Sequence, residues 1–123
     1  MNTHILAIDD SRTIRELVRA VLGDAGFEVT TAEDGVLGIE AFGEKRFDTV
    51  ITDINMPNMD GFGVIEAIRR GRTNKRVPIL VLTTESGPAL KDRARKAGAT
   101  GWIVKPFDDG ELIDVCRQVS GAA

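Results

Sequence analysis

The feature that most constrains the fold is a short β-branched run, Thr49–Thr52, that ends at the carboxylate of Asp53. β-Branched residues in such a run are typical of a buried strand. A loop is expected to follow, because the next positions are rich in the turn formers Asn, Pro and Gly. Ligands bind beyond the carboxyl ends of the strands in open α/β sheets, so Asp53 is a candidate site residue.

Strand-like and helix-like segments alternate along the whole chain. Apolar or alternating runs predict strands at residues 4–8, 27–31, 49–52, 79–82 and 102–104. Apolar stripes, one of them weak, predict helices at residues 14–22, 36–42, 62–68, 89–97 and 112–119, although Gly35, Gly38 and Gly43 lower the helix propensity of the second. The pattern predicts an α/β fold: a parallel five-stranded sheet, doubly wound as (βα)5, in a three-layer sandwich. We expect one domain over residues 1–123.

Composition excludes several classes of protein. The net charge of −3 gives no overall attraction to nucleic acid. No apolar run approaches the roughly 20 residues of a membrane span, and the N-terminus lacks the pattern of a signal peptide, so we expect a cytoplasmic protein with no membrane insertion. One cysteine and one histidine make a zinc cluster implausible, and any metal should have oxygen ligands. Cys116 lies on an apolar stripe and is predicted to be a buried, inert thiol.

Polar residues follow four of the five predicted strands. They are Asp9, Asp10, Asp53, Thr83 and Lys105. Parallel strands all end at one edge of the sheet, so these side chains should gather there. Crowded carboxylates repel one another unless a cation lies among them, and Mg²⁺ is the hard divalent ion that suits such a site. The lysine and the hydroxyl suit a phosphoryl group, and an aspartate beside the metal could form an acyl phosphate.

These motifs, in this order, resemble response-regulator receiver domains over essentially the whole chain. The resemblance is nearest to the single-domain chemotaxis regulators of that family. It rests on Asp-Ile-Asn-Met-Pro-Asn-Met-Asp-Gly at 53–61, Thr-Thr-Glu at 83–85 and Gly-Trp-Ile-Val-Lys-Pro-Phe at 101–107. It implies a flavodoxin-like sheet with the strand order 2-1-3-4-5.

The resemblance also implies roles at the predicted edge. Asp53 would accept a phosphoryl group from a phosphohistidine. Asp10, Asp53 and the backbone carbonyl of Asn55 would bind Mg²⁺ directly, and Asp9 would act mainly through a metal-bound water. Lys105 would pair with the phosphoryl oxygens.

Other positions would transmit or tune the signal. Thr83 would move toward the phosphoryl group, coupled to the aromatic residue at Trp102. The family usually has tyrosine, phenylalanine or histidine there, so the bulkier indole puts the usual inward swing in doubt. Asn55 and Glu85 occupy positions that would set the lifetime of the acyl phosphate.

The resemblance implies a two-component switch that supports its own phosphoryl transfer and autodephosphorylation but is not an enzyme acting on outside substrates. Expected partners are a histidine kinase or a histidine phosphotransfer domain, a flagellar motor switch component as output, and a phosphatase. A phosphate sink or phosphorelay intermediate without motor output stays open. We expect a monomer that binds no nucleic acid.

Two rival functions fit the predicted fold less well. An aspartyl-phosphate phosphatase needs an acid two residues after its nucleophile, where this chain has Asn55. A flavin carrier needs a Ser-, Thr- and Gly-rich phosphate loop, whereas Asp9 and Asp10 would repel a phosphate without a metal.

Basic residues form further groups whose role the sequence leaves open. Arg69, Arg70, Arg72, Lys75 and Arg76 form a run, and Lys91, Arg93, Arg95 and Lys96 are expected nearby. They are either a solvated face or a docking surface for an acidic partner segment. Arg12, Arg15 and Arg19 fall on the first predicted helix, where they could steer a phosphodonor.

Overall fold

The computed structural model describes residues 2–121. Five strands alternate with five helices: β1 (His4–Ile8), α1 (Arg12–Asp24), β2 (Glu28–Ala32), α2 (Gly35–Glu44), β3 (Thr49–Thr52), α3 (Gly61–Arg70), β4 (Ile79–Thr83), α4 (Pro88–Ala97), β5 (Gly101–Val104) and α5 (Asp109–Ser120). All neighbouring strands are parallel and lie in the order β2-β1-β3-β4-β5. The predicted α/β fold and strand order are confirmed.

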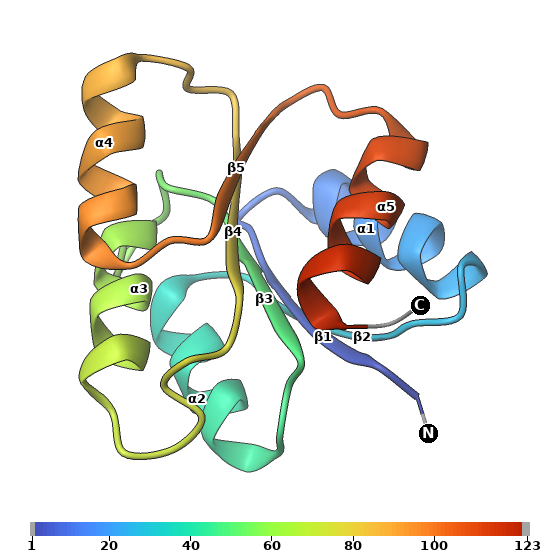
Figure 1. Ribbon diagram of the computed structural model, residues 1–123, viewed down its shortest axis with the longest axis horizontal. Helices are drawn as coiled ribbons and strands as arrows, with labels where there is room; N and C mark the ends of the chain where they lie inside the picture. The colour runs from blue at the N-terminus through green and yellow to red at the C-terminus, as the bar shows by residue number, and fades with distance from the viewer. Residues whose placement is uncertain (1, 122–123) are drawn as a thin grey trace.

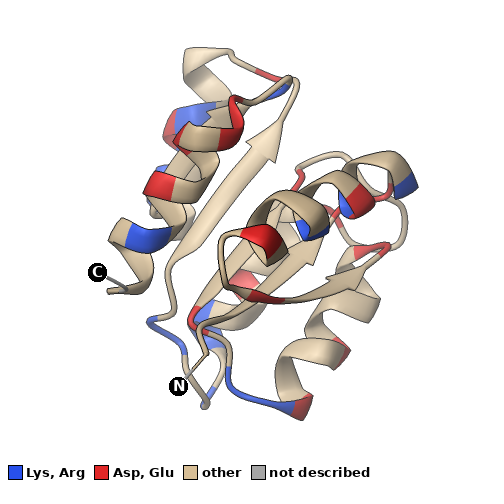
Figure 2. Cartoon of the chain, turned by 90° about the vertical axis from the view of Figure 1, so that its right-hand side faces the viewer, with Lys and Arg blue, Asp and Glu red and all other residues tan. Residues whose placement is uncertain are grey.

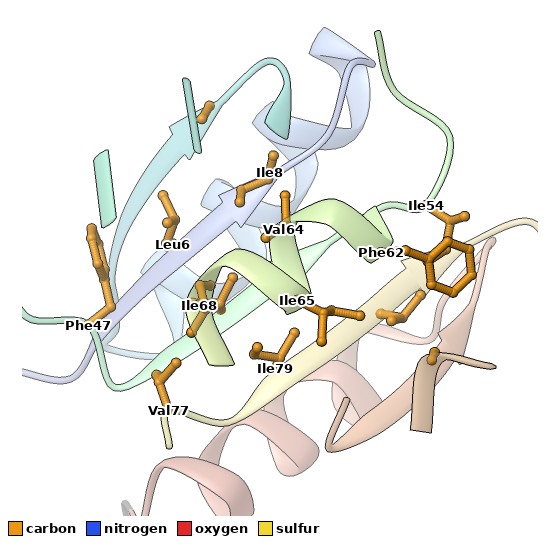
Figure 3. Close-up of a cluster of buried hydrophobic side chains, with 14 residues drawn as sticks. Leu6, Ile8, Phe47, Ile54, Phe62, Val64, Ile65, Ile68, Val77 and Ile79 are labelled. Carbon is orange, nitrogen blue, oxygen red and sulfur yellow. The ribbon is translucent and has the colours of Figure 1, made fainter. Parts of the chain in front are cut away.

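The sheet separates two helical layers (Figure 1). Helices α1 and α5 cover one face, and α2, α3 and α4 cover the other. In β1, Ile5 and Ala7 point to the first layer, while Leu6 and Ile8 point to the second. Figure 3 shows Leu6 and Ile8 among the side chains of the second core, which α3 closes with Ile65.

The central strands are buried along their whole length. Every residue of β3 and of β4 is buried, as expected of parallel strands covered on both faces. This rigid centre holds Asp53 at its end, because Asp53 directly follows β3. Among residues 2–121, none of the helices is both long enough and apolar enough to cross a membrane.

The helix that the sequence predicted least well in detail is α2. The apolar stripe predicted within residues 36–42 includes Val36, but the exposed fraction of Val36 is 40%. Gly35 and Gly38 are buried instead. A Cβ at Gly38 would overlap the side chain of Ile8, so glycine lets α2 pack closely on β1. Two of the three glycines that lower the helix propensity therefore lie on the packing face of this helix, whereas Gly43 is exposed.

Helix α4 is attached more weakly than the others. Ala94 is its one buried residue, and its N-cap, Gly87, makes no side-chain capping hydrogen bond. Its C-terminal end is held firmly, because the guanidinium of Arg69 donates two hydrogen bonds, of 3.0 and 2.8 Å, to the carbonyl of Gly98. The start of α4 and the loop before it are thus less constrained than its end.

Candidate functional site

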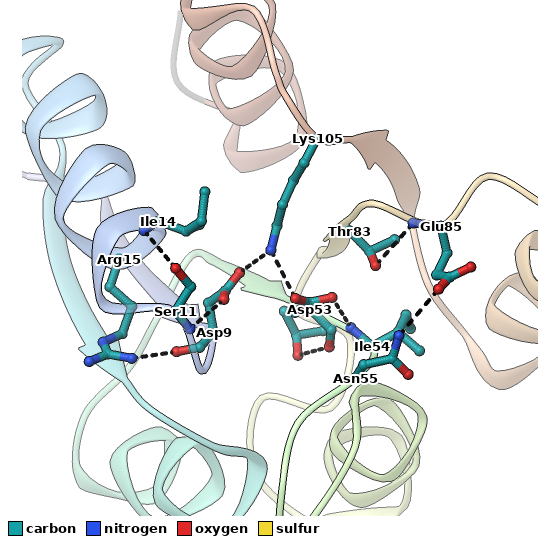
Figure 4. A network of polar contacts seen from close by, with 11 residues as sticks. Asp9, Ser11, Ile14, Arg15, Asp53, Ile54, Asn55, Thr83, Glu85 and Lys105 are labelled. Carbon is teal, nitrogen blue, oxygen red and sulfur yellow. Dashed lines mark hydrogen bonds and ion pairs between the residues drawn. The ribbon is translucent and has the colours of Figure 1, made fainter.

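Asp53 lies at the carboxyl end of β3 with its side chain nearly buried (Figure 4). Its backbone N–H donates to the carbonyl of Ile8, 3.0 Å away, which fixes Asp53 beside the end of β1. Oδ2 lies 2.8 Å from Nζ of Lys105, and Oδ1 accepts a hydrogen bond of 2.6 Å from the N–H of Ile54. The carboxylate is therefore held in one orientation by a cation and a backbone donor.

Asp9 faces Asp53 from the end of β1. Its Oδ2 lies 2.7 Å from Nζ of Lys105, and its Oδ1 accepts a hydrogen bond of 2.9 Å from the N–H of Ser11. Arg15 donates a 2.7 Å hydrogen bond to the carbonyl of Asp9. The sequence placed Arg15 on a surface facing a phosphodonor and missed this contact, which fixes the turn between β1 and α1.

Lys105 joins the two carboxylates from β5's side of the site, as Figure 4 shows. Burial alone would lower the pKa of Lys105, but hydrogen bonds to Asp53 and Asp9 outweigh it and raise the pKa. Burial raises the pKa of Asp9 despite the contact with Lys105. The ammonium of Lys105 is thus held in its charged form. The ion pair with Lys105 does not fully offset the cost of burying the charged carboxylate of Asp9.

The carboxylates fit a hard divalent cation. Asp9, Asp10 and Asp53 each offer an oxygen, and these oxygens lie within 4.8 Å of one another. Asp9 and Asp53 are buried, whereas Asp10 is exposed, so a cation between them would keep access to water. Oxygen ligands with room for several waters are what Mg²⁺ requires.

The loop after Asp53 depends on a glycine and on an asparagine. A Cβ at Gly61 would overlap the carbonyl oxygen of Asp53, so only glycine allows this close return of the chain. Asn58 has a left-handed φ of 69°, and its Nδ2 donates to Oδ2 of Asp34 over 2.9 Å. The sequence identified Asn58 only as a turn former, yet it ties this loop to the start of α2.

Thr83, Glu85 and Asn55 form a second group beside Asp53. Thr83 is buried at the end of β4, and its Oγ1 accepts from the N–H of Glu85 over 3.4 Å. Nδ2 of Asn55 donates to Oε1 of Glu85, also over 3.4 Å. Within residues 2–121, no hydrogen bond joins Thr83 to Asp53. Glu85 therefore links the two loops that flank the carboxylate.

Trp102 lies outside this cluster. Its ring is half-buried and lines a surface pocket with Pro88, Ala94 and Arg95 of α4. Its Nε1 donates to the carbonyl of Glu85, which connects β5 to the loop after Thr83.

A family model described as "Response regulator receiver domain" matches residues 5–117, most of the chain. The chain belongs to this family. The matched range includes all of the candidate site residues Asp9, Asp10, Asp53, Thr83 and Lys105. Receiver domains of this kind are phosphoacceptor switches.

Similar proteins support this membership. The chemotaxis protein CheY1 of Helicobacter pylori is 41% identical over 120 residues, which cover 95% of this chain and 96% of that protein. The structure of Vibrio cholerae CheY4 is 44% identical with a TM-score of 0.92, covering 97% of this receiver and 99% of that chain. The receiver domain of a Pseudomonas aeruginosa PAO1 sensor histidine kinase is 26% identical with a TM-score of 0.90, and the match covers 98% of this chain and 99% of that chain. That structure has a magnesium ion coordinated in its active-site cleft.

Proposed function

We propose that the protein is a single-domain response regulator that accepts a phosphoryl group on Asp53 from a phosphohistidine. The observation that carries the proposal is the Asp53 carboxylate, nearly buried at the end of β3 with Nζ of Lys105 at 2.8 Å. A carboxylate oxygen would form the new O–P bond as the N–P bond of the donor breaks. The ammonium would then lie beside the transferred phosphoryl oxygens and stabilise their charge.

Mg²⁺ would be held by Asp10, Asp53 and the backbone carbonyl of Asn55, with Asp9 acting mainly through a bound water. The metal would supply charge neutralisation for the phosphoryl oxygens. The compact group of carboxylates supports this assignment. The raised pKa of Asp9, caused first by burial, is further support, since a nearby cation would relieve the cost of its charge.

The switch would connect Asp53 to the surface through the loop between β4 and α4. Thr83 is buried next to Asp53, and Glu85 contacts Thr83, Asn55 and Trp102. We assign Thr83 and Trp102 to signal transmission, and Asn55 and Glu85 to control of water access and autodephosphorylation. Phosphorylation would shift an existing equilibrium between two arrangements of this loop.

The output would be phosphorylation-dependent binding of a partner in chemotaxis, with a flagellar motor switch component as the expected target. The chemotaxis relatives support this part of the proposal. The donor would be a cytoplasmic histidine kinase or phosphotransfer domain. A phosphate sink or phosphorelay intermediate needs the same site residues and is the second candidate.

The test of the phosphoacceptor is incubation with acetyl phosphate and Mg²⁺, followed by intact mass measurement. The wild type should gain one phosphoryl group, and Asp53→Asn should gain none. Asp24→Asn, which changes an exposed aspartate at the end of α1, is the matched control and should react like the wild type. A phosphoryl group that persists in Asp53→Asn, or its absence from the wild type, would contradict the assignment.

A second experiment separates signalling from a sink. Binding to a flagellar motor switch component is compared for the protein with and without acetyl phosphate. Tighter binding of the phosphorylated wild type, lost in Asp53→Asn, supports motor output. If phosphorylation leaves this binding unchanged, while the protein still accepts phosphoryl groups from the kinase, the result supports a phosphate sink.

A further inference from the structure

Six exposed cations lie at the edge of the sheet opposite Asp53. Arg70 ends α3, and the other five lie in the two loops that lead into β3 and β4. These five are Lys45, Arg46, Arg72, Lys75 and Arg76. Figure 1 shows both loops at the bottom of the molecule, whereas the loops after β4 and β5 lie at the top. Figure 2 shows blue segments gathered at this same lower end. The surface is therefore distinct from the receiver site.

These cations have no acidic partners in the part of the chain that the structure describes. Among residues 2–121, none of the six forms an ion pair. The basic residues of α4 differ, since Arg95 and Lys96 both pair with Asp92. A chain of net charge −3 thus keeps a concentrated positive potential at one edge.

The two loops are held together in a fixed shape. Nδ2 of Asn74 donates a 2.8 Å hydrogen bond to the carbonyl of Phe47, which joins one loop to the other. Nη1 of Arg69 donates to the carbonyls of Lys75 and Val77, each over 2.7 Å. A preformed surface loses less conformational entropy on binding than a mobile one.

An apolar groove runs between these loops and the ends of α2 and α3. One hollow, of about 350 Å³, has Phe42 beside Lys45 and Arg46. A second, of about 220 Å³, shares Phe42 and Thr73 with the first and continues to Ile39 and Arg72. Together they form the basic groove, which has an apolar floor and a cationic rim.

We propose that the basic groove binds an acidic peptide segment of a partner protein, with one large apolar side chain seated on Phe42. The cations on both walls would face carboxylates that flank this anchor, and the floor would bury it. A nucleic acid fits less well, because Glu44 also lines the groove: a peptide can space its carboxylates away from Glu44, whereas a continuous phosphate backbone cannot. The protein would then hold one partner here while the opposite edge undergoes phosphorylation.

The test begins with selection of random peptides displayed on phage against the intact protein. Peptides are counter-selected on a triple variant that removes the cations lining the groove, Lys45→Ser, Arg46→Ser and Arg72→Ser. We expect enrichment of sequences with several Asp or Glu residues around one large apolar residue. If selection gives no such consensus, the proposal is wrong.

The selected peptide is then titrated into ¹⁵N-labelled wild type. Amide shifts should change at residues 42–46 and 71–76, and the affinity should fall about tenfold or more in the triple variant and with rising salt. A control that removes three cations from α4, Lys91→Ser, Arg95→Ser and Lys96→Ser, should bind normally. Replacing the apolar anchor of the peptide by serine should weaken binding about tenfold.

Three results would overturn the proposal: shifts confined to α4 and β5, equal loss of affinity in the control variant, or tighter binding of a single-stranded oligonucleotide of the same charge. The experiment uses unphosphorylated protein and requires no reaction at Asp53. Failure here would leave the proposed phosphoacceptor role intact.

Discussion

The indole Nε1 of Trp102 donates a 2.9 Å hydrogen bond to the backbone carbonyl of Glu85. This contact joins β5 to the loop that follows the buried Thr83. A rearrangement of that loop must therefore either move the indole or break this bond. Trp102 is also the one tryptophan of the chain, so tryptophan fluorescence reports on the surroundings of this indole alone.

We expect Trp102 fluorescence to change on addition of Mg²⁺ and to change further with acetyl phosphate. The second change should be absent in Asp53→Asn, whereas Asp24→Asn should behave like the wild type. If mass measurement shows phosphorylation but the fluorescence stays constant, the indole does not take part in the switch.

Lys105→Ala should destabilise the protein, and less so when magnesium is present. The substitution leaves the Asp9 and Asp53 carboxylates facing each other without their shared cation, and breaking a buried ion pair costs about 3 kcal/mol. Urea unfolding at neutral pH measures the free energy of unfolding, and added Mg²⁺ should restore part of the loss. The control is Lys91→Ala on α4, which should unfold like the wild type. Equal stability of Lys105→Ala and wild type would contradict the structural role of the ion pairs.

The charged carboxylate of Asp34 should stabilise the folded protein, and protonation in acid should remove this stabilisation. The hydrogen bond from the N–H of Leu37, and then that from Asn58, lowers the pKa of Asp34 in the folded protein. Because the folded pKa lies below the unfolded one, the stabilisation is complete above about pH 4 and is lost as the pH falls through the folded value. In urea unfolding from about pH 6 to pH 3, the stability difference between wild type and Asp34→Asn should shrink toward acid pH. A difference independent of pH would show that the charge of Asp34 contributes nothing.

Cys116 should not react in the folded protein. The thiol is fully buried, and burial raises its pKa to about 12, so little thiolate forms at pH values near neutral. A disulfide reagent should label no thiol in buffer at pH 8 and one thiol in concentrated urea. Fast labelling without urea would mean that α5 opens readily or that the thiol is exposed.

The sequence was sufficient to predict how the site residues come together. Asp9, Asp53, Thr83 and Lys105 all follow strand-like runs, and parallel strands end at a common edge whatever the details of their packing. The burial of Cys116 was predicted from the apolar spacing of its helix and is confirmed. The chemical roles of the edge residues stay predictions, which the experiments above address.

Features that depend on contacts between distant segments could not be predicted. Val36 fits an apolar stripe, but it is exposed because α2 packs with Gly38 against Ile8 of β1 and with Gly35 against Met59. The bond from Trp102 to Glu85 joins residues 17 positions apart, and the bond from Asn74 to Phe47 joins residues 27 apart. Local spacing carries no information about such pairs, so both the position of the indole and the shape of the basic groove required the three-dimensional structure.

The contact of Lys105 with two aspartates has a consequence for electroneutrality. Three carboxylates and one ammonium leave the site with two formal negative charges, which one divalent cation cancels. A monovalent ion would leave the site anionic, and a trivalent ion would leave it cationic. Calcium and manganese satisfy the same balance as magnesium, so discrimination among these ions must come from ionic radius and the cost of dehydration rather than from charge.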